Sequence, residues 1–397
     1  VRHPQRVALA VMDGLNLPPG GPGDEFITRY MKPFEVSDDG SHLTTAWSRA
    51  RDLHRFFPWF DRSAKSRLPM EFPSDAYLHA YTLDLMMAGA NYSAAYSAAM
   101  RYLALPRLAA LTAPAVFMCR ANDPLFAYLD TVEQNRPASA RVMRLSGDRD
   151  EWLTTLRELF RSVSVDSFAP PDVKPGNTQG CTYLSLSHGQ VRVRLQGPLD
   201  APPVILLHDP PGSVHSLAAL AADLAATRRV ITMDFPGEGE SDPLPTPDCH
   251  HFGAVIAQVL ESLGIAQADV YAQHLAVPIA VECAVQSPQR VRRLLLDGPQ
   301  LLGKSEARQL WKQYCPSVTP KWDGSHLVTL WHVLRDRELN WPWYSRAVSS
   351  IRQRPLTRDA ANLHALVTDL VKQPARYADA CLAAIECKLA DAAARLA

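Results

Sequence analysis

The sequence predicts an α/β fold, with a doubly wound and mostly parallel sheet and additional helical segments. Between residues 203 and 297, short apolar runs alternate with stretches of helical periodicity. Such alternation is typical of parallel strands in one sheet with helices on both faces. The run PVILLH at Pro203 is apolar throughout, as expected of a strand that is covered on both sides. A hydrophobic content of 47% permits the core that this arrangement needs.

The elements predicted after residue 180 follow one another closely. In order, they are a hairpin of 182–187 and 190–195, a strand over 203–208, a helix over 217–226, a strand over 229–234, a helix over 252–263, a strand over 268–273, a helix over 275–285 and a strand over 291–297. From residue 300 onward the chain is mostly helical and rich in Trp, Leu, Ala and Arg, and no strong strand is predicted there.

The first part of the chain has fewer strand signals. LTAPAVFMCRANDPLF at Leu111 predicts a strand that ends in a turn. ASARVMRL at Ala138 predicts another strand, and residues 152–162 predict a helix. Residues 164–180 are dense in proline and glycine and have no apolar periodicity, so we interpret them as a linker.

Two long segments of the chain are similar to each other. VRHPQRVALAVMDG at Val1 recurs as VQSPQRVRRLLLDG at Val285. DGSHLTTAW at Asp39 recurs as DGSHLVTLW at Asp323, so the offset is 284 residues in both cases. The similarity predicts that residues 1–103 and 285–388 are two copies of one segment. A period of this length excludes a solenoid repeat.

Composition narrows the classes of function. The net charge is zero and no basic face is visible, which argues against a nucleic-acid partner. The sequence contains no run of 18 apolar residues, so we predict no membrane span. The first residues, VRHPQR, lack the pattern of a signal peptide. The seven cysteines form no C-x-x-C pair, which is typical of reduced thiols in a cytoplasmic protein. We expect neither a metal nor a cofactor.

Four segments carry a family resemblance: LLHDPPGS at Leu206, DFPGEGESD at Asp234, SPQRVRRLLLDG at Ser287 and LTAPAVFMCRANDP at Leu111. Through these four segments the chain resembles the α/β-hydrolase superfamily, and in particular its branch with a helical cap between the sixth and seventh strands. The resemblance covers nearly the whole chain, as a C-terminal portion followed by an N-terminal portion.

The resemblance implies four regions. They are a C-terminal portion of a hydrolase domain (1–163), a linker (164–180), the N-terminal core of a hydrolase domain (181–299) and a second copy of the cap (300–397). Two histories fit this order. The chain could be part of a tandem fusion, or residues 111–163 could supply the last two strands to the sheet built from 181–297.

The nucleophile of this superfamily sits in a G-x-S-x-G turn between a strand and a helix. The corresponding residues 272–276 read AQHLA, so His274 stands where the serine is expected. By position, the resemblance implies that the amide of Leu275 is one oxyanion donor and that the loop at His208 supplies the other. Asp209 replaces the glycine of the family, and an anionic side chain there would oppose the developing negative charge.

The other catalytic positions also depart from the family. The loop after LTAPAVFMCRANDP places Asp123 at the acid site, although an Asp before a proline is also a common turn residue. The region expected to hold the catalytic histidine, 145–152, contains none. His274 could activate a water, form a covalent intermediate or be a relic in a former pocket. His208 is expected to support its loop rather than to react.

The repeated D-G-S-H-L segment offers further candidates. His42 and His326 occupy equivalent positions, and we predict that His326 faces the cavity between cap and sheet, toward His274, as a stand-in for the missing base. The alternative is that both histidines bond to the backbone inside the cap. Asp323 and Ser325 could contribute to a binding pocket or could cap the start of a helix.

Three functions remain open at this point. The first is hydrolysis of a small ester or carbonyl (C–C) substrate by a non-serine arrangement. The second is a catalytically silent protein that binds a small molecule under its cap. The third is an assembly partner, in which another chain or a second copy of this chain completes an unfinished sheet. The superfamily favours the first, and the missing serine favours the second.

Overall fold

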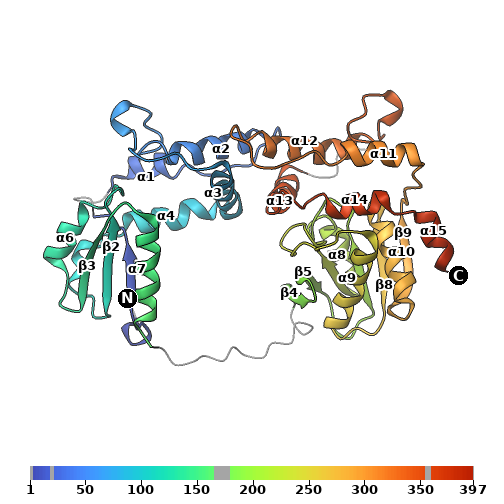
Figure 1. Ribbon diagram of the computed structural model, residues 1–397, viewed down its shortest axis with the longest axis horizontal. Coiled ribbons are helices and arrows are strands. Elements are labelled where there is room, and N and C mark those ends of the chain that lie inside the picture. The colour runs from blue at the N-terminus through green and yellow to red at the C-terminus, as the bar shows by residue number, and fades with distance from the viewer. Residues whose placement is uncertain (1–2, 18–21, 165–178, 354–358, 397) are drawn as a thin grey trace. The chain divides into compact units, whose positions relative to one another are not determined.

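The computed structural model describes residues 3–17, 22–164, 179–353 and 359–396. The chain divides into two compact units (Figure 1). The first comprises residues 1–35, 49–74 and 88–171, and the second comprises 36–48, 75–87 and 172–397. The predicted linker, 164–180, falls almost wholly outside the described residues.

The first unit is built on a parallel sheet with the strand order β1-β2-β3, formed by Ala10–Asp13, Ala115–Arg120 and Ala140–Leu145. Alternate side chains of β2 point to opposite faces of the sheet. Phe117 packs with helices α5 and α6, whereas Met118 packs with helix α7. The helices of this unit are α1 (Asp24–Tyr30), α4 (Asn91–Arg101), α5 (Leu105–Leu108), α6 (Tyr128–Asn135) and α7 (Arg149–Arg161).

Helix α7 begins three residues before the predicted start. The carboxylate of Asp148 accepts a hydrogen bond from the Glu151 N–H at 2.7 Å, which satisfies one of the free amides of the first turn. The prediction missed this cap because it relied on apolar periodicity, which begins only at Trp152.

The second unit contains a six-stranded sheet with the order β4-β5-β7-β6-β8-β9. Its first two pairings are antiparallel and the other three are parallel, so the predicted mostly parallel α/β fold is confirmed. The strands are β4 (Gly180–Leu186), β5 (Gly189–Gln196), β6 (Pro203–Leu207), β7 (Arg229–Met233), β8 (Ala268–Gln273) and β9 (Val291–Asp297).

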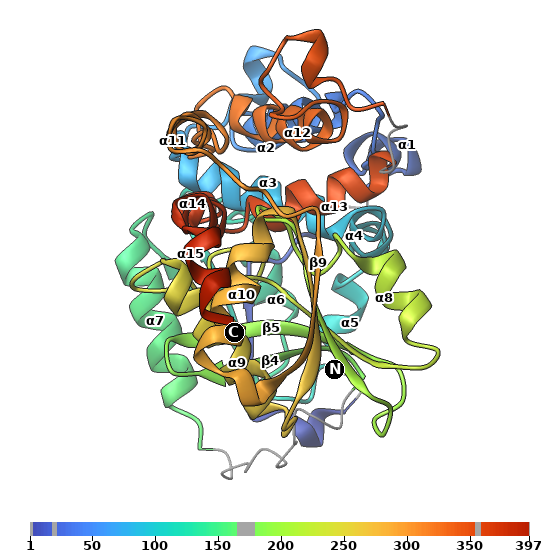
Figure 2. The same ribbon diagram turned by 90° about the vertical axis from the view of Figure 1, so that its right-hand side faces the viewer.

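Both faces of this sheet are covered by helices (Figure 2). Ile205 and Leu207 of β6 belong to the core formed with α9 (Cys249–Ser262) and α10 (Val277–Gln286). Val204 and Leu206 pack instead against α8 (Ala218–Leu224). The wholly apolar strand predicted at this position is therefore buried on both sides, which explains its lack of alternation.

The DFPGEGESD turn fixes two loops at the carboxyl ends of neighbouring strands. The buried Asp234 carboxylate accepts hydrogen bonds from the Val214 N–H at 2.7 Å and from the Glu240 N–H at 3.2 Å. A Cβ at Gly239 would lie 2.2 Å from the same carboxylate, and this residue has a φ of 53°, so glycine is required here. Burial raises the pKa of Asp234 to about 6.

The second unit also holds the cap helices. Five of them lie wholly in this unit: α11 (Lys304–Gln313), α12 (Ser325–Leu339), α13 (Ala360–Leu370), α14 (Asp379–Glu386) and α15 (Leu389–Ala393). The greater part of α2 (Ser41–Leu53) and of α3 (Asp75–Ala88) also belongs to it. Short 3-10 turns lie at Pro4–Arg6, Ala64–Ser66, His274–Ala276, Pro288–Arg290, Val348–Ser350 and Ala394–Leu396.

The two similar segments have corresponding elements and meet through reciprocal contacts. Gly40, with a φ of 78°, lies against the Trp331 indole, where an added Cβ would come within 2.7 Å. Its counterpart Gly324, with a φ of 76°, lies against Trp47, where an added Cβ would come within 2.4 Å. These two glycine–tryptophan contacts are therefore reciprocal, as in a two-fold symmetric interface.

Candidate functional site

The turn after β8 keeps the geometry of a nucleophile elbow without a hydroxyl group. His274 has a φ of 45°, and among the described residues it alone has a positive φ without being glycine. Such a conformation is costly for an ordinary side chain and often marks a functional position. The His274 Nδ1 lies 3.2 Å from the carbonyl oxygen of Gly298, which follows β9. A half-buried imidazole therefore stands on a turn of unusual backbone conformation between β8 and α10.

The amide that would serve as oxyanion donor is already occupied. The Leu275 N–H donates to Asp209 Oδ1 at 3.1 Å. The other carboxylate oxygen of Asp209 accepts from the Arg337 guanidinium of α12 at 2.7 Å. The Asp209 carboxylate thus joins the Leu275 amide to the Arg337 guanidinium. Sequence reasoning predicted that Asp209 would oppose the developing charge, but it missed Arg337, which neutralises the carboxylate.

His208 lies behind this loop, in the core. Its side chain is 2% exposed, and its ring stands edge-on to Phe235 with centroids 5.0 Å apart. The Nε2 atom is 3.6 Å from Glu238 Oε2, which accepts the Gly212 N–H. Burial lowers the pKa of His208 to about 4 and raises that of Glu238 well above its ordinary value, because it disfavours the charged form of each group. This position fits support of the loop.

A second histidine of the same loop forms a carboxylate–imidazole pair that the sequence did not suggest. His215 Nδ1 lies 2.7 Å from Asp369 Oδ2, at the end of α13. Burial opposes ionisation of the Asp369 carboxyl. The hydrogen bond with His215 and the Lys372 ammonium, whose Nζ is 2.9 Å from Asp369 Oδ1, favour ionisation more strongly and hold the pKa of this carboxyl well below its usual range. The ionised carboxylate therefore fixes the orientation of the His215 ring.

These groups converge on one cavity of about 340 Å³. Its polar lining comes from the oxyanion loop, the elbow and the cap helices. It consists of Asp209, His215, Ser216, Gln273, His274, Tyr314, Arg337, Glu338, Arg352 and Asn362. Leu217 and Leu366 contribute apolar walls. A concave site with apolar walls and a few convergent polar groups is the usual form of a small-molecule site.

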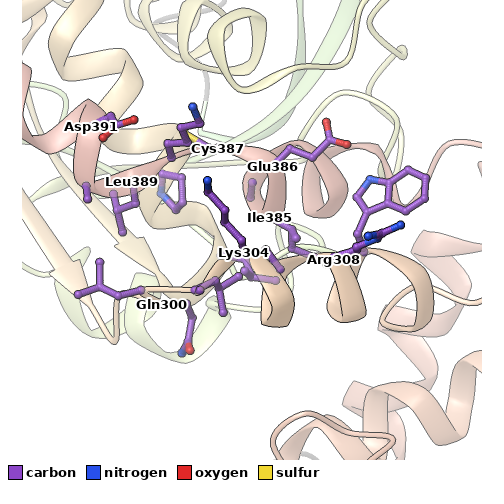
Figure 3. A pocket seen from close by; sticks show the side chains of 18 residues that line it. Gln300, Lys304, Arg308, Ile385, Glu386, Cys387, Leu389 and Asp391 are labelled. Carbon is purple, nitrogen blue, oxygen red and sulfur yellow. The ribbon is translucent and has the colours of Figure 1, made fainter.

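A larger cavity of about 1030 Å³ lies between α11 and the α14–α15 segment (Figure 3). Gln300, Lys304 and Arg308 line one side of it, and Glu386 and Cys387 line the other. It includes Leu275 but neither His274 nor His215. We place the candidate site in the smaller cavity because the elbow, the His215–Asp369 pair and Arg337 meet there.

The structure places His326 away from the elbow. It is fully buried in the first turn of α12 and faces His79 of α3. The Lys321 N–H donates to its Nδ1 at 3.2 Å, so the ring proton is on Nε2, which lies 3.0 Å from His79 Nδ1. The proton on His79 Nε2 then points to the carbonyl oxygen of Val371 at 2.8 Å. This placement differs from the expected orientation toward His274, because both ring nitrogens are used inside the cap.

His42 has the equivalent environment in the other segment. The Ser37 N–H donates to its Nδ1 at 3.2 Å, and its Nε2 lies 3.2 Å from His364 Nδ1. The partner histidine of each pair comes from the opposite segment, 247 residues away for His326 and 322 residues away for His42. The alternative interpretation, a hydrogen-bonded role inside the cap, describes both histidines.

The remaining predicted residues form turns. Asp323 Oδ1 accepts the Ser325 N–H at 3.0 Å in the turn before α12, whose N-cap residue is Gly324. Asp123 follows β2 in the first unit, where its Oδ1 accepts the Leu125 N–H at 2.8 Å. His274 belongs to the second unit, so the structure assigns no geometry to an Asp123–His274 pair.

Comparison with known proteins supports the assignment of the fold. Residues 202–382 match the family model described as alpha/beta hydrolase fold. An acetyltransferase component of an acetoin cleaving system from Pseudomonas putida (dihydrolipoyllysine-residue acetyltransferase) is 32% identical over 104 residues. This match covers 26% of the chain and only 28% of that protein.

Solved structures of hydrolases align with about half of the chain. An enol-lactonase from Burkholderia xenovorans LB400 aligns over 54% of this chain and 78% of its own, at 17% identity and a TM-score of 0.43. A carboxylesterase from Bacillus subtilis aligns over 50% and 65%, at 16% identity and a TM-score of 0.38. The strand order and the family match together show that residues 202–382 have the α/β-hydrolase fold. Within the described ranges, no helix is long and apolar enough to cross a membrane.

Proposed function

We propose that this protein binds a small molecule in the cavity above the elbow and has lost the serine chemistry of the hydrolase fold. The observation that carries the proposal is the hydrogen bond from the Leu275 N–H to the Asp209 carboxylate at 3.1 Å. While this amide donates to Asp209, it is not free to stabilise the oxyanion of a substrate. The imidazole of His274, in place of a hydroxyl group, removes the nucleophile as well.

The magnitudes support loss of serine catalysis. Removing one oxyanion donor commonly costs ~10²–10³-fold in turnover. Removing a general base costs a further ~10²–10⁴-fold. Binding needs neither group. It needs a cavity with apolar walls and oriented polar groups, and Leu366, His215 and Asn362 provide these.

A cavity-filling variant tests the binding site. Asn362→Trp places an indole in the cavity, whereas the neighbouring Ala361 is exposed and does not line it, so Ala361→Trp is the matched control. In a thermal-shift screen of small polar compounds, we expect hits with the wild type and with Ala361→Trp that disappear with Asn362→Trp. Compounds that still stabilise Asn362→Trp would show that the binding site lies elsewhere.

A second candidate function is hydrolysis by water that His215 activates. The 2.7 Å contact between His215 and Asp369 favours it, because an oriented imidazole in the same cavity could act as a general base. His215→Gln should then abolish turnover of p-nitrophenyl acetate, while His274→Gln should preserve it. Turnover that is absent from the wild type, or unchanged by His215→Gln, excludes this candidate.

We also infer that the two similar segments arose by duplication, and the reciprocal contacts of Gly40 with Trp331 and of Gly324 with Trp47 support this.

A partner that completes the sheet of the second unit stays a prediction. The exposed fractions of Leu295 and Leu296 in β9, 48% and 39%, are consistent with a partner there.

A further inference from the structure

Arg337 is positioned independently of the carboxylate that it pairs with. Its Nη1 donates to the Pro211 carbonyl oxygen at 2.8 Å, and its Nη2 donates to the Pro210 carbonyl oxygen at 3.2 Å. The guanidinium also lies over the Tyr314 ring, 5.4 Å from its centroid. These contacts involve backbone carbonyls and a buried ring, so we expect them to hold the guanidinium when the Asp209 side chain is removed.

The Asp209 carboxylate is bound as a ligand would be bound. One oxygen accepts from the Leu275 N–H at 3.1 Å and the other from Arg337 at 2.7 Å. An amide on one oxygen and a guanidinium on the other satisfy a carboxylate well, because hydrogen bonds to an ionised acceptor are the strong ones. The Arg337 and Asp209 side chains are 10% and 20% exposed, so the pair is shielded, and both line the cavity.

We propose that the Leu275 amide and the Arg337 guanidinium form a carboxylate-binding site, and that Asp209 is its internal occupant. The ligands of the adjoining cavity are then small carboxylic acids whose carboxylate exchanges with Asp209. This inference rests on the proposed function, because it names the ligand class of the same cavity. Asp209 lines the cavity, so a ligand bound there lies beside its carboxylate.

An ordinary structural ion pair makes a different prediction. If Asp209 and Arg337 only join the loop to α12, removal of the carboxylate weakens the protein and no external anion restores it. If the amide and the guanidinium form a receptor, removal of the carboxylate leaves a vacant site that an external carboxylate fills.

The experiment compares Asp209→Ala with Asp209→Asn. Alanine vacates the site, whereas asparagine removes the charge but still fills the space. We expect sodium acetate to raise the Tm of Asp209→Ala saturably, by about 2–4 °C at concentrations several-fold above its Kd. Sodium chloride at the same ionic strength should not do so, and acetate should not stabilise Asp209→Asn. The double variant Asp209→Ala with Arg337→Met should lose the response.

A folded Asp209→Ala protein without a saturable, acetate-specific shift overturns the proposal. If this variant does not fold, Asp209→Gly and refolding in acetate or in chloride provide the same test. Folding that depends on acetate supports the receptor, and failure in both salts counts against it. The Asn362→Trp screen is separate: acetate binding by Asp209→Ala without any wild-type hit would reject the proposed function but retain the receptor.

Discussion

At the scale of the residue, two substitutions test the elbow and the amide beside it. His274→Ser alone restores a hydroxyl group on the elbow but leaves the Leu275 N–H bonded to Asp209. We expect only slow labelling by a fluorophosphonate. Adding Asp209→Gly frees that amide, and labelling should become faster by about 10²-fold, the usual value of one oxyanion donor. Mass spectrometry of the labelled peptide measures both rates. Equal rates in the single and double variants would mean that Asp209 does not block the site.

The elbow also depends on a glycine outside it. A Cβ on Gly298 would lie 2.5 Å from His274 Nδ1, and Gly298 has a φ of 61°. Gly264 provides a control, because its φ is 66° but an added Cβ would meet nothing within 4 Å.

Gly264→Ala should therefore cost only the backbone strain, about 1 kcal/mol. Gly298→Ala should cost about 2–3 kcal/mol, because it also displaces the imidazole. Urea denaturation measures both free energies of unfolding. An equal loss in the two variants would show that the His274 ring is not held against Gly298.

At the scale of the element, the cap helices meet through two pairs of hydrogen-bonded imidazoles. In each pair a backbone N–H donates to the first ring, so the first ring can donate to the second only while both rings are neutral. Burial lowers the pKa of His42 and of His326 to about 4, and it also lowers the pKa values of His79 and His364. The charge of Asp39 opposes the lowering of the His42 pKa, and the charge of Asp323 opposes that of His326. Lys321 lowers the pKa of His326 further.

The sign of the pH dependence follows from these depressed pKa values. Below pH ~6.5 the unfolded chain binds protons that the folded cap excludes. The stabilisation is therefore complete above pH ~6.5 and is lost as the pH falls toward 4, by about 2–3 kcal/mol for each fully shifted imidazole. Urea midpoints at pH 7.5 and pH 5 measure this loss. The double variant His79→Gln, His364→Gln should reduce the pH dependence without removing it, because His42, His326 and His208 remain buried. A dependence as steep as that of the wild type would contradict the role of these pairs.

At the scale of the whole molecule, the sequence predicted what lies close along the chain. The strands, the helices and the elbow at 272–276 follow from apolar periodicity and from motifs of a few residues. The contacts that define the site join distant residues, 128 apart for Asp209 with Arg337 and 154 apart for His215 with Asp369. No local pattern marks such pairs.

The same limit explains the position of His326. Its equivalence to His42 was visible in the sequence, but a repeat does not say that one copy packs against the other. The histidine partners come from the other of the two similar segments, so His326 contacts His79 and does not face His274. A matched pair of polar residues in two copies could have suggested a self-complementary contact.

Fluorophosphonate labelling of the wild-type protein, followed by peptide mass spectrometry, tests the central claim most directly. The account predicts that no serine of the folded chain is labelled above the level of the denatured control, because the elbow carries His274 and its oxyanion amide is held by Asp209. Stoichiometric labelling of a single serine in the folded protein would contradict it.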